Sequence, residues 1–217
     1  VMRNDTYAVS FDRVTTAAER SYFSGDGTSY SDMSYTSSGL PRNVNIRAKI
    51  RNNTTTTENL TYVPDDNFEQ ALIDLGYDDV IDDYVLTANI SVITDLDISS
   101  KEISDLTGID DFTALTDLDC EDNLLTSLDI SNNTALTWLH CFGNQLTALD
   151  VSNNTALTEL RCGQNALTSL DVSANTSLTL LRCQGNQLTA LDLSNNTVLD
   201  EVHCGANEFS SLNLSSN

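Results

Sequence analysis

The chain has 217 residues, a net charge of −22, 40% hydrophobic residues and only 6% aromatic residues. The charge is uneven, since residues 1–60 hold seven Lys and Arg against six Asp and Glu, whereas residues 61–217 hold three against 26. Such an acidic surface repels nucleic acids and anionic membranes. No apolar run approaches the roughly 18 residues that span a bilayer. We therefore expect an extracellular or cell-surface protein without nucleic-acid binding or membrane insertion.

Residues 1–60 differ from the rest and are expected to form a small β-rich segment. Alternating apolar and polar residues predict one strand over residues 7–12 and another over residues 44–51. Sixty residues make a poor independent core, so we expect this segment to anchor or assemble the chain. The candidate assembly residues are Tyr7, Phe11, Tyr22, Tyr30, Arg47 and Lys49.

Residues 61–92 are expected to form a helical N-terminal cap. Pro64 can open a helix at its first turn, and Gly76 can end it. An apolar stripe at helical spacing joins Phe68, Ala71, Leu72 and Leu75, and acidic residues that favour a helix start are Asp65, Asp66 and Glu69. A second short helix is predicted over residues 77–86.

Residues 93–217 contain an internal repeat, with a first coil of 22 residues followed by repeats of 21 residues. All five cysteines occur at this step in the frame LxxLxCxxN, and they are Cys120, Cys141, Cys162, Cys183 and Cys204. A constant period of this length predicts a solenoid in which each coil buries its leucines against its neighbours. The second half of each unit repeats the theme, as in residues 146–154. We therefore expect two extended sides per coil and no helix on the back.

The strand in each frame has two inward and two outward side chains, because faces alternate along a strand. In the second repeat Leu139 and Cys141 point inward, and Trp138 and His140 point outward. The inward cysteines are predicted to be free core residues, since their number is odd and stacked neighbours point in parallel. A straight ladder also cannot surround a zinc ion. No metal or cofactor is expected.

The frame LxxLxCxxN resembles the core of leucine-rich repeats. Together with residues 62–76 and 103–109, it is similar to secreted internalin-like leucine-rich repeat proteins of the Bacteroidota. The resemblance covers residues 61–217 and implies export to a surface or secreted location. The predicted fold is a leucine-rich repeat solenoid of parallel β coils, with a short helical N-terminal cap and a preceding β-rich segment. Because Val1 opens the chain and Asn217 closes a half-repeat without a polar cap, we expect a piece of something longer or a covered end.

The outward positions of the cysteine side vary from coil to coil, which favours a binding face. The candidate partner-binding residues are Trp138, His140, Phe142, Glu159, Arg161, Leu180, Arg182 and His203. Trp and Arg are common binding anchors, and such residues could stack on sugar rings or dock an acidic peptide. The alternative is scattered surface substitution without a function.

The other side instead repeats one aspartate per coil, at Asp129, Asp150, Asp171 and Asp192. This column could gather Ca²⁺, but evenly spaced single carboxylates do not make a cage of six to eight oxygens. The favoured interpretation is a solvated face on which each Asp bonds locally.

Catalysis is not expected. His140 and His203 lie three coils apart, about 14 Å at strand spacing, and no known catalytic or nucleotide-binding motif is present. Two functions remain open. The first is recognition of a protein or glycan through the cysteine-side face. The second is a structural subunit of an extracellular fibre or virion spike, in which residues 1–60 assemble and the acidic solenoid is exposed decoration.

Overall fold

The computed structural model describes residues 7–8, 22–23 and 59–210, and the chain divides into two compact units, Val1–Thr56 and Thr57–Asn217. In the first unit β1 (Tyr7–Ala8) pairs antiparallel with β2 (Tyr22–Phe23). Two assembly candidates, Tyr7 and Tyr22, lie in these strands. The expected strand over residues 44–51 lies outside the described residues, as does Asn217. The other four assembly candidates also lie outside them, and they are Phe11, Tyr30, Arg47 and Lys49.

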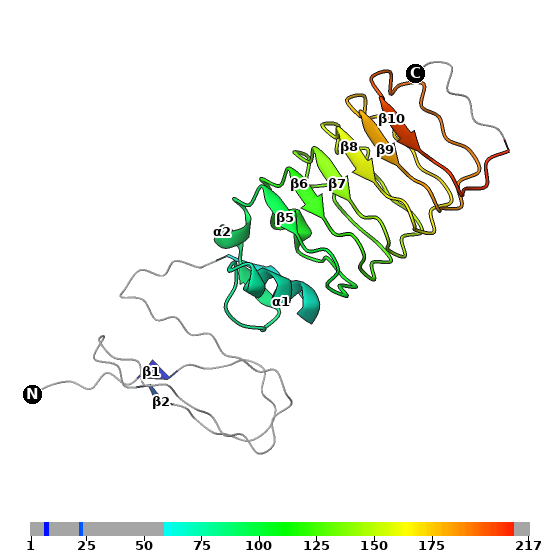
Figure 1. Ribbon diagram of the computed structural model, residues 1–217. Helices are drawn as coiled ribbons and strands as arrows, with labels where there is room; N and C mark the ends of the chain where they lie inside the picture. Colours follow the sequence, from blue (N-terminus) through cyan, green and yellow to red (C-terminus); the bar gives the residue numbers. More distant parts are fainter. Residues whose placement is uncertain (1–6, 9–21, 24–58, 211–217) are drawn as a thin grey trace, which may run out of the picture. The chain divides into compact units, whose positions relative to one another are not determined.

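The second unit is a solenoid built on one parallel sheet (Figure 1). Its strands stack in chain order: β5 (Asp95–Asp97), β6 (Asp117–Asp119), β7 (Trp138–His140), β8 (Glu159–Arg161), β9 (Leu180–Arg182) and β10 (Glu201–His203). The register pairs each residue with its counterpart one repeat away, so that Leu118 lies opposite Leu139 and Leu139 opposite Leu160. The predicted leucine-rich repeat solenoid is therefore confirmed.

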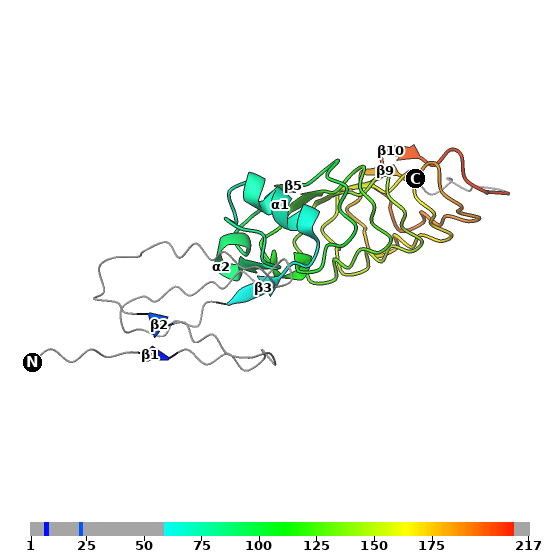
Figure 2. The same ribbon diagram turned by 90° about the horizontal axis from the view of Figure 1, so that it is seen from below.

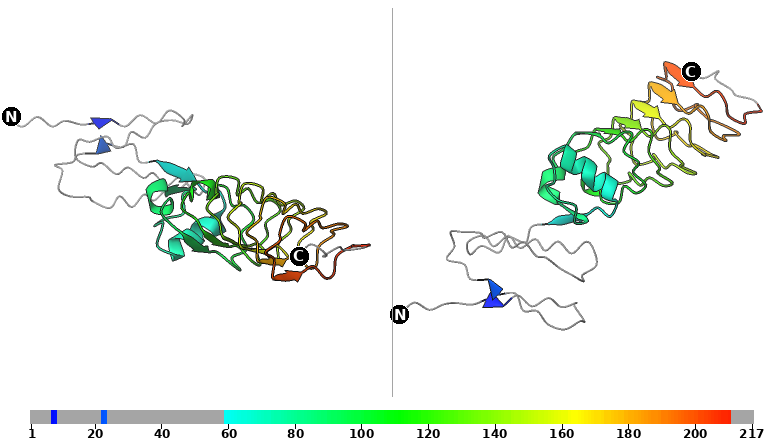
Figure 3. Two further views of the ribbon diagram at one scale, coloured as in Figure 1. Left: turned by 90° about the horizontal axis from the view of Figure 1, so that it is seen from above. Right: turned by 60° about the horizontal axis from the view of Figure 1, so that its bottom comes forward.

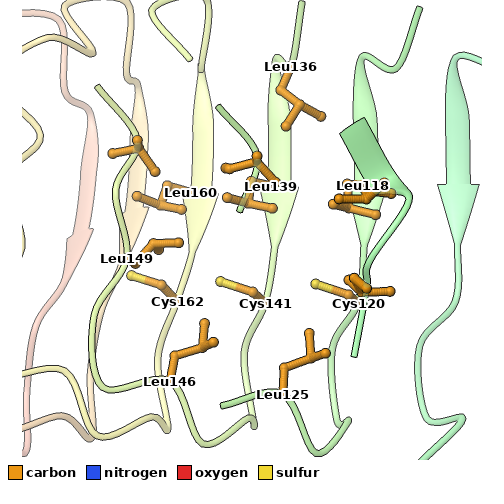
Figure 4. Packing of buried hydrophobic residues seen from close by; sticks show 14 of the residues in the cluster. Leu118, Cys120, Leu125, Leu136, Leu139, Cys141, Leu146, Leu149, Leu160 and Cys162 are labelled. Atoms are coloured by element: carbon orange, nitrogen blue, oxygen red, sulfur yellow. The ribbon is translucent and has the colours of Figure 1, made fainter. Parts of the chain in front are cut away.

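The core is a set of stacked leucine and cysteine columns (Figure 4). Leu139 and Cys141 are fully buried, and Cys120, Cys141 and Cys162 form a row whose side chains point the same way. All five cysteines are free, as predicted; four are buried and Cys204 is half-buried. Burial raises the pKa of the Cys183 thiol to about 12 and raises the pKa values of Cys141 and Cys162 well above the usual range. These thiols therefore act as apolar core groups.

Asparagines close the turns after β6 to β10. Asn144 Oδ1 accepts from the Leu125 backbone N–H at 3.0 Å, and its Nδ2 donates to the Cys120 and Cys141 carbonyls at 2.9 and 3.2 Å. The residue before each of these asparagines has a left-handed φ, and these residues are Asp122, Gly143, Gln164, Gly185 and Ala206. One short amide thus ties two consecutive coils together at their tightest bend.

The prediction of two extended sides per coil was wrong for the second side. Within residues 59–210 the strands of the solenoid occupy one side, and the other sides are loops (Figure 2). Backbone bonds such as Gln145 N–H to Leu125 O, 2.8 Å, still join coils there. However, the Ser152 N–H donates to the Asp150 carboxylate at 2.9 Å instead of to a neighbouring coil. These local turns remove the donors that a second ladder needs.

The cap gathers at the β5 end of the solenoid (Figure 3). β3 (Leu60–Tyr62) pairs antiparallel with β4 (Tyr84–Leu86), and these strands flank α1 (Asp66–Asp74), followed by α2 (Thr87–Ile90). A 3₁₀ turn, η1 (Ile109–Asp111), belongs to the first coil. Asp65 caps α1 by accepting from the Asn67 and Phe68 N–H groups.

Three details of the cap differ from expectation. Pro64 precedes the N-cap and is not the first helical residue, and Leu75 is 44% exposed. Residues 77–86 form no second helix, because buried Glu69 accepts hydrogen bonds from the backbone N–H groups of residues 82–84 at 2.9 to 3.2 Å. Burial raises the pKa of Glu69, and these bonds oppose the shift. A carboxylate expected to complement the helix start therefore fixes a loop.

Candidate recognition face

The outward side chains of the sheet form two columns set by the strand register. The first runs Asp95, Asp117, Trp138, Glu159, Leu180 and Glu201, and the second runs Asp97, Asp119, His140, Arg161, Arg182 and His203. We call this surface the recognition face. The coils of β5 and β6 present only carboxylates in the two columns, whereas the later coils mix both signs with apolar groups.

Trp138 is the large exposed apolar side chain on this face. It is 45% exposed, and its ring stacks on His140 with centroids 5.6 Å apart and planes 25° apart. His140 itself is only 8% exposed. The imidazole therefore packs against the indole and limits the positions that the indole can adopt.

A network of charged groups surrounds His140, the ring partner of Trp138. His140 Nε2 is 3.0 Å from Glu159 Oε1, and Arg161 Nε lies 2.5 Å from the same oxygen without the angle of a hydrogen bond. His140 Nδ1 is 3.7 Å from Asp119 Oδ2. Interaction with Asp119 raises the pKa of His140, while burial opposes that shift. Burial would raise the pKa of Asp119, but His140 and the Glu121 backbone N–H outweigh it and lower the value.

A second, more exposed pairing lies at β9 and β10. Glu201 Oε1 accepts from Arg182 Nη2 at 2.9 Å and lies 2.7 Å from His203 Nε2. The Arg182 guanidinium lowers the pKa of the Glu201 carboxyl. Because the His203 and Glu201 side chains are about half exposed, this pairing contributes little to stability.

The eight predicted binding residues all lie on the face or next to it, but they are not equally available. His140 and Glu159 were expected to point outward into solvent, and the structure buries both because they cover each other. Phe142 is half-buried beside Gly163. Asp119 and Glu121, which were not among the predicted residues, join His140 in a cluster whose ligand-type atoms lie within 4.8 Å of one another. The column positions in the repeat frame could have revealed this neighbourhood.

On the opposite side the aspartates bond locally. Asp129, Asp150, Asp171 and Asp192 each accept from the backbone N–H of the serine two residues later. Hydrogen bonds from the N–H and the hydroxyl of that serine lower the carboxyl pKa values. Within the part of the chain that the structure describes, two close groups of metal-ligand side chains occur, and neither includes any of these four aspartates. A shallow depression between two coils is lined by Ala148, Leu149, Asp150, Ser169, Asp171 and Ser173.

One parallel sheet, a 21-residue step and a free-cysteine core define a leucine-rich repeat solenoid. Its fold is similar to the functional domain of InlJ from Listeria monocytogenes, described as including a cysteine ladder, with a TM-score of 0.60 and 35% identity over 76% of this chain and 42% of that one. An internalin, inlF, from Listeria monocytogenes strain 4b F2365 gives a TM-score of 0.65 at 24% identity, over 69% of this chain and 46% of that one.

Sequence comparison also points to internalin J. Internalin J of Listeria monocytogenes serotype 4b is 40% identical over 72 residues, which is 33% of this chain and 8% of that protein. A family described as LVIVD repeat matches residues 141–161, the length of one repeat. The chain thus spans less than half of each of these relatives. The comparisons support the internalin-like resemblance and give no support to an origin in the Bacteroidota.

Proposed function

We propose that the solenoid is a non-catalytic extracellular or cell-surface module that binds a protein or glycan through the recognition face. The observation that carries this proposal is Trp138, an indole left 45% exposed on a rigid sheet and packed against His140. A large apolar side chain in this position loses contact with water when a partner covers it.

The surroundings of Trp138 suit a specific contact. Arg161 and Leu180 lie one and two coils away on the same face and are partly exposed, so the face offers cationic and apolar groups in addition to the indole. Trp and Arg dominate many binding interfaces. The hydrogen-bonded sheet is ordered before binding, which reduces the entropy lost on association.

The similarity to internalin J and inlF supports the surface or secreted location that the resemblance implies. Within the described residues no helix is long and apolar enough to cross a membrane. The charged groups around His140 lie on one face of the sheet, and the histidines of the two pairings are three coils apart. This arrangement favours binding over catalysis.

The test is a screen of the full chain against a glycan array and purified surface-protein ectodomains, repeated with Trp138→Ala. A matched control is Val198→Ala, whose side chain is similarly exposed at 52% but lies outside the strands. We expect Trp138→Ala to weaken a genuine partner by about 30-fold or more, the size of a hot-spot effect of about 2 kcal/mol. A partner that tolerates both Trp138→Ala and Arg161→Ala contradicts the use of this face.

The second candidate function is structural, and the charge asymmetry favours it: residues 1–60 are slightly basic, whereas residues 61–217 are strongly acidic. In this alternative residues 1–60 assemble a fibre or virion spike, and basic residues of one copy contact acidic solenoids of others. Solution masses of the full chain and residues 57–217 test it. The shorter chain begins at the unit boundary and retains β3. Assembly of the full chain alone supports the structural role, and two monomers contradict it.

A further inference from the structure

Three side chains that can bind a metal ion meet at the edge of the recognition face. Asp119 ends β6, Glu121 follows two residues later, and His140 ends β7. The register places Asp119 directly opposite His140. The candidate ligand atoms of all three residues lie within 4.8 Å of one another.

The hydrogen bonds of His140 determine which ring nitrogen faces this cluster. Nε2 lies 3.0 Å from Glu159 Oε1. An ionised carboxylate only accepts hydrogen bonds, so this contact assigns the proton of a neutral imidazole to Nε2. The Nδ1 lone pair then faces Asp119 Oδ2, which is 3.7 Å away and carries no proton to donate. In this neutral form a nitrogen lone pair and two carboxylates converge. Because Asp119 also favours the imidazolium, binding of a metal ion would displace the proton that Nδ1 then carries.

The charges nearby leave this convergence unbalanced. Arg161 is the neighbouring cation on β8. Its Nε lies 2.5 Å from Glu159 Oε1, and its single positive charge also acts on Asp119 and Glu121. Asp119 Oδ1 accepts from the Glu121 backbone N–H at 3.0 Å, which leaves Oδ2 facing His140. Within residues 59–210, the Glu121 carboxylate has no hydrogen bond or ion pair to a side chain that would balance its charge. A divalent cation would balance the two carboxylates.

We propose that Asp119, Glu121 and His140 Nδ1 bind a divalent cation of the Zn²⁺ class. An imidazole nitrogen with carboxylate oxygens suits zinc, whereas Ca²⁺ and Mg²⁺ take oxygen ligands. Glu159 accepting from Nε2–H supplies the outer carboxylate that commonly orients a metal-binding histidine. With three ligands from one surface, the remaining coordination position is open to water or to a group of a partner. The site does not depend on the function proposed above.

The second close cluster, Asp66, Glu69 and Asp83, does not carry the same inference. The two Glu69 oxygens already accept three backbone hydrogen bonds. This cluster also lacks a nitrogen ligand, so nothing beyond acidity points to a metal there.

His203 provides a matched comparison within the chain. Its Nε2 also contacts a carboxylate, Glu201, at 2.7 Å. However, the preceding coil places Arg182 opposite His203, where His140 has Asp119. The repeat position that holds Glu121 beside His140 holds Gln184 beside His203. His203 therefore lacks the two carboxylates of the proposed site.

The test is calorimetric titration of the full chain with ZnCl₂, and with CaCl₂ in parallel, at neutral pH. Four variants are compared with the wild type: His140→Gln, Asp119→Asn, His203→Gln and Cys204→Ala. The last variant removes the half-buried thiol, which could bind zinc by itself. Thermal melting of each variant without metal confirms that it is folded.

We expect one equivalent of Zn²⁺ to bind and to raise the melting temperature of the wild type, as any ligand of the folded state does. His140→Gln and Asp119→Asn should each weaken binding by about tenfold or more, whereas His203→Gln and Cys204→Ala should bind like the wild type. The proposal is overturned if folded His140→Gln binds Zn²⁺ as well as the wild type does. Absence of Zn²⁺ binding, or Ca²⁺ binding of equal strength, overturns it as well.

Discussion

Asp65 and Ser104 are 39 residues apart in sequence, and one oxygen of the Asp65 carboxylate binds both the N–H and the hydroxyl of Ser104. Asp65 Oδ2 accepts from the Ser104 N–H at 2.9 Å and from the Ser104 hydroxyl at 2.7 Å. The other oxygen of Asp65 caps α1. One side chain thus fixes both the start of the cap helix and its attachment to the first coil.

Replacing Asp65 should therefore lower the free energy of unfolding by more than the loss of a typical helix N-cap does. We expect Asp65→Ala to lower the free energy of unfolding by about 2 kcal/mol, the upper end of the range for N-caps, measured by chemical denaturation. Asp66→Ala is the control, since Asp66 is the exposed first residue of the same helix. A loss of equal size in both variants would contradict the bridging role of Asp65.

The same carboxylate should make stability depend on pH. Partial burial alone would raise the pKa of Asp65, but bonds from Ser104, Phe68 and Asp105 outweigh it and lower the pKa below 3.8. A group whose folded pKa is depressed stabilises the fold above its unfolded pKa, and this contribution is lost as pH falls through the folded pKa. The difference in unfolding free energy between wild type and Asp65→Asn should therefore shrink as pH falls from about 5 toward 2. A difference that is constant over this range would exclude the charged form as its source.

The cysteines should differ sharply in reactivity along the ladder. Four thiols are buried with raised pKa values, whereas Cys204 is half-buried. Because the thiolate is the reactive form, a thiol reagent should modify Cys204 alone in the native protein and all five residues after denaturation. Mass spectrometry of the labelled protein counts the modified residues. Rapid native labelling of Cys162 would show that the solenoid opens.

Replacement of cysteine by serine should be tolerated at Cys204, in the last coil, but not at Cys162 in the middle of the cysteine row. Cys162→Ser buries a hydroxyl among apolar groups and should cost about 1–3 kcal/mol, whereas Cys204→Ser should change stability by less than about 0.5 kcal/mol. The measurement is denaturant unfolding of both variants. Equal losses would mean that the end coil is as well packed as the middle one.

The glycines that follow the strands should differ in whether they tolerate replacement by alanine. Gly143 has φ +68°, and an added Cβ would collide with the Asp122 carboxylate, whereas a Cβ at Gly205 would meet nothing within 4 Å. Gly143→Ala should therefore destabilise by about 1 kcal/mol or more, and Gly205→Ala should be neutral or slightly stabilising. Melting temperatures of the two variants provide the check. A neutral Gly143→Ala would show that this turn relaxes.

Two adjacent asparagines allow a test of the asparagine side-chain bonds that join consecutive coils. Buried Asn154 donates to the Ile130 and Asn133 carbonyls at 3.1 and 2.9 Å, whereas exposed Asn153 donates to Ser131 O at 3.2 Å. Asn154→Ala leaves two buried carbonyls without these donors and should cost about 1–3 kcal/mol. Asn153→Ala should stay within about 0.5 kcal/mol by the same unfolding assay. The reverse order would refute the buried asparagine bonds as a source of stability.

The repeat period allowed much of the solenoid to be predicted, because Leu139 and Cys141 must point inward in every copy. The sequence does not show whether a backbone N–H bonds locally or to the neighbouring coil. The second extended side was therefore predicted wrongly, because the Ser152 N–H bonds to Asp150 in a local turn. The loop over residues 82–84 was missed because a sequence does not show that Glu69 turns inward to bind it. On the recognition face, periodicity placed His140 correctly in its column, but its burial depends on contact with Glu159, which is a property of two side chains together.

The row of cysteines has a consequence for how such a chain can change. The coils containing β6 to β9 each offer their neighbours the same inward Leu–Cys surface, so the coils containing β7 and β8 are interchangeable as far as the interior is concerned. Unequal recombination by 21 residues would duplicate, delete or shuffle whole coils while preserving every inward contact type. The outward residues would be rearranged in the same event. The order of surface residues along the recognition face can then change while the packing of the interior stays the same.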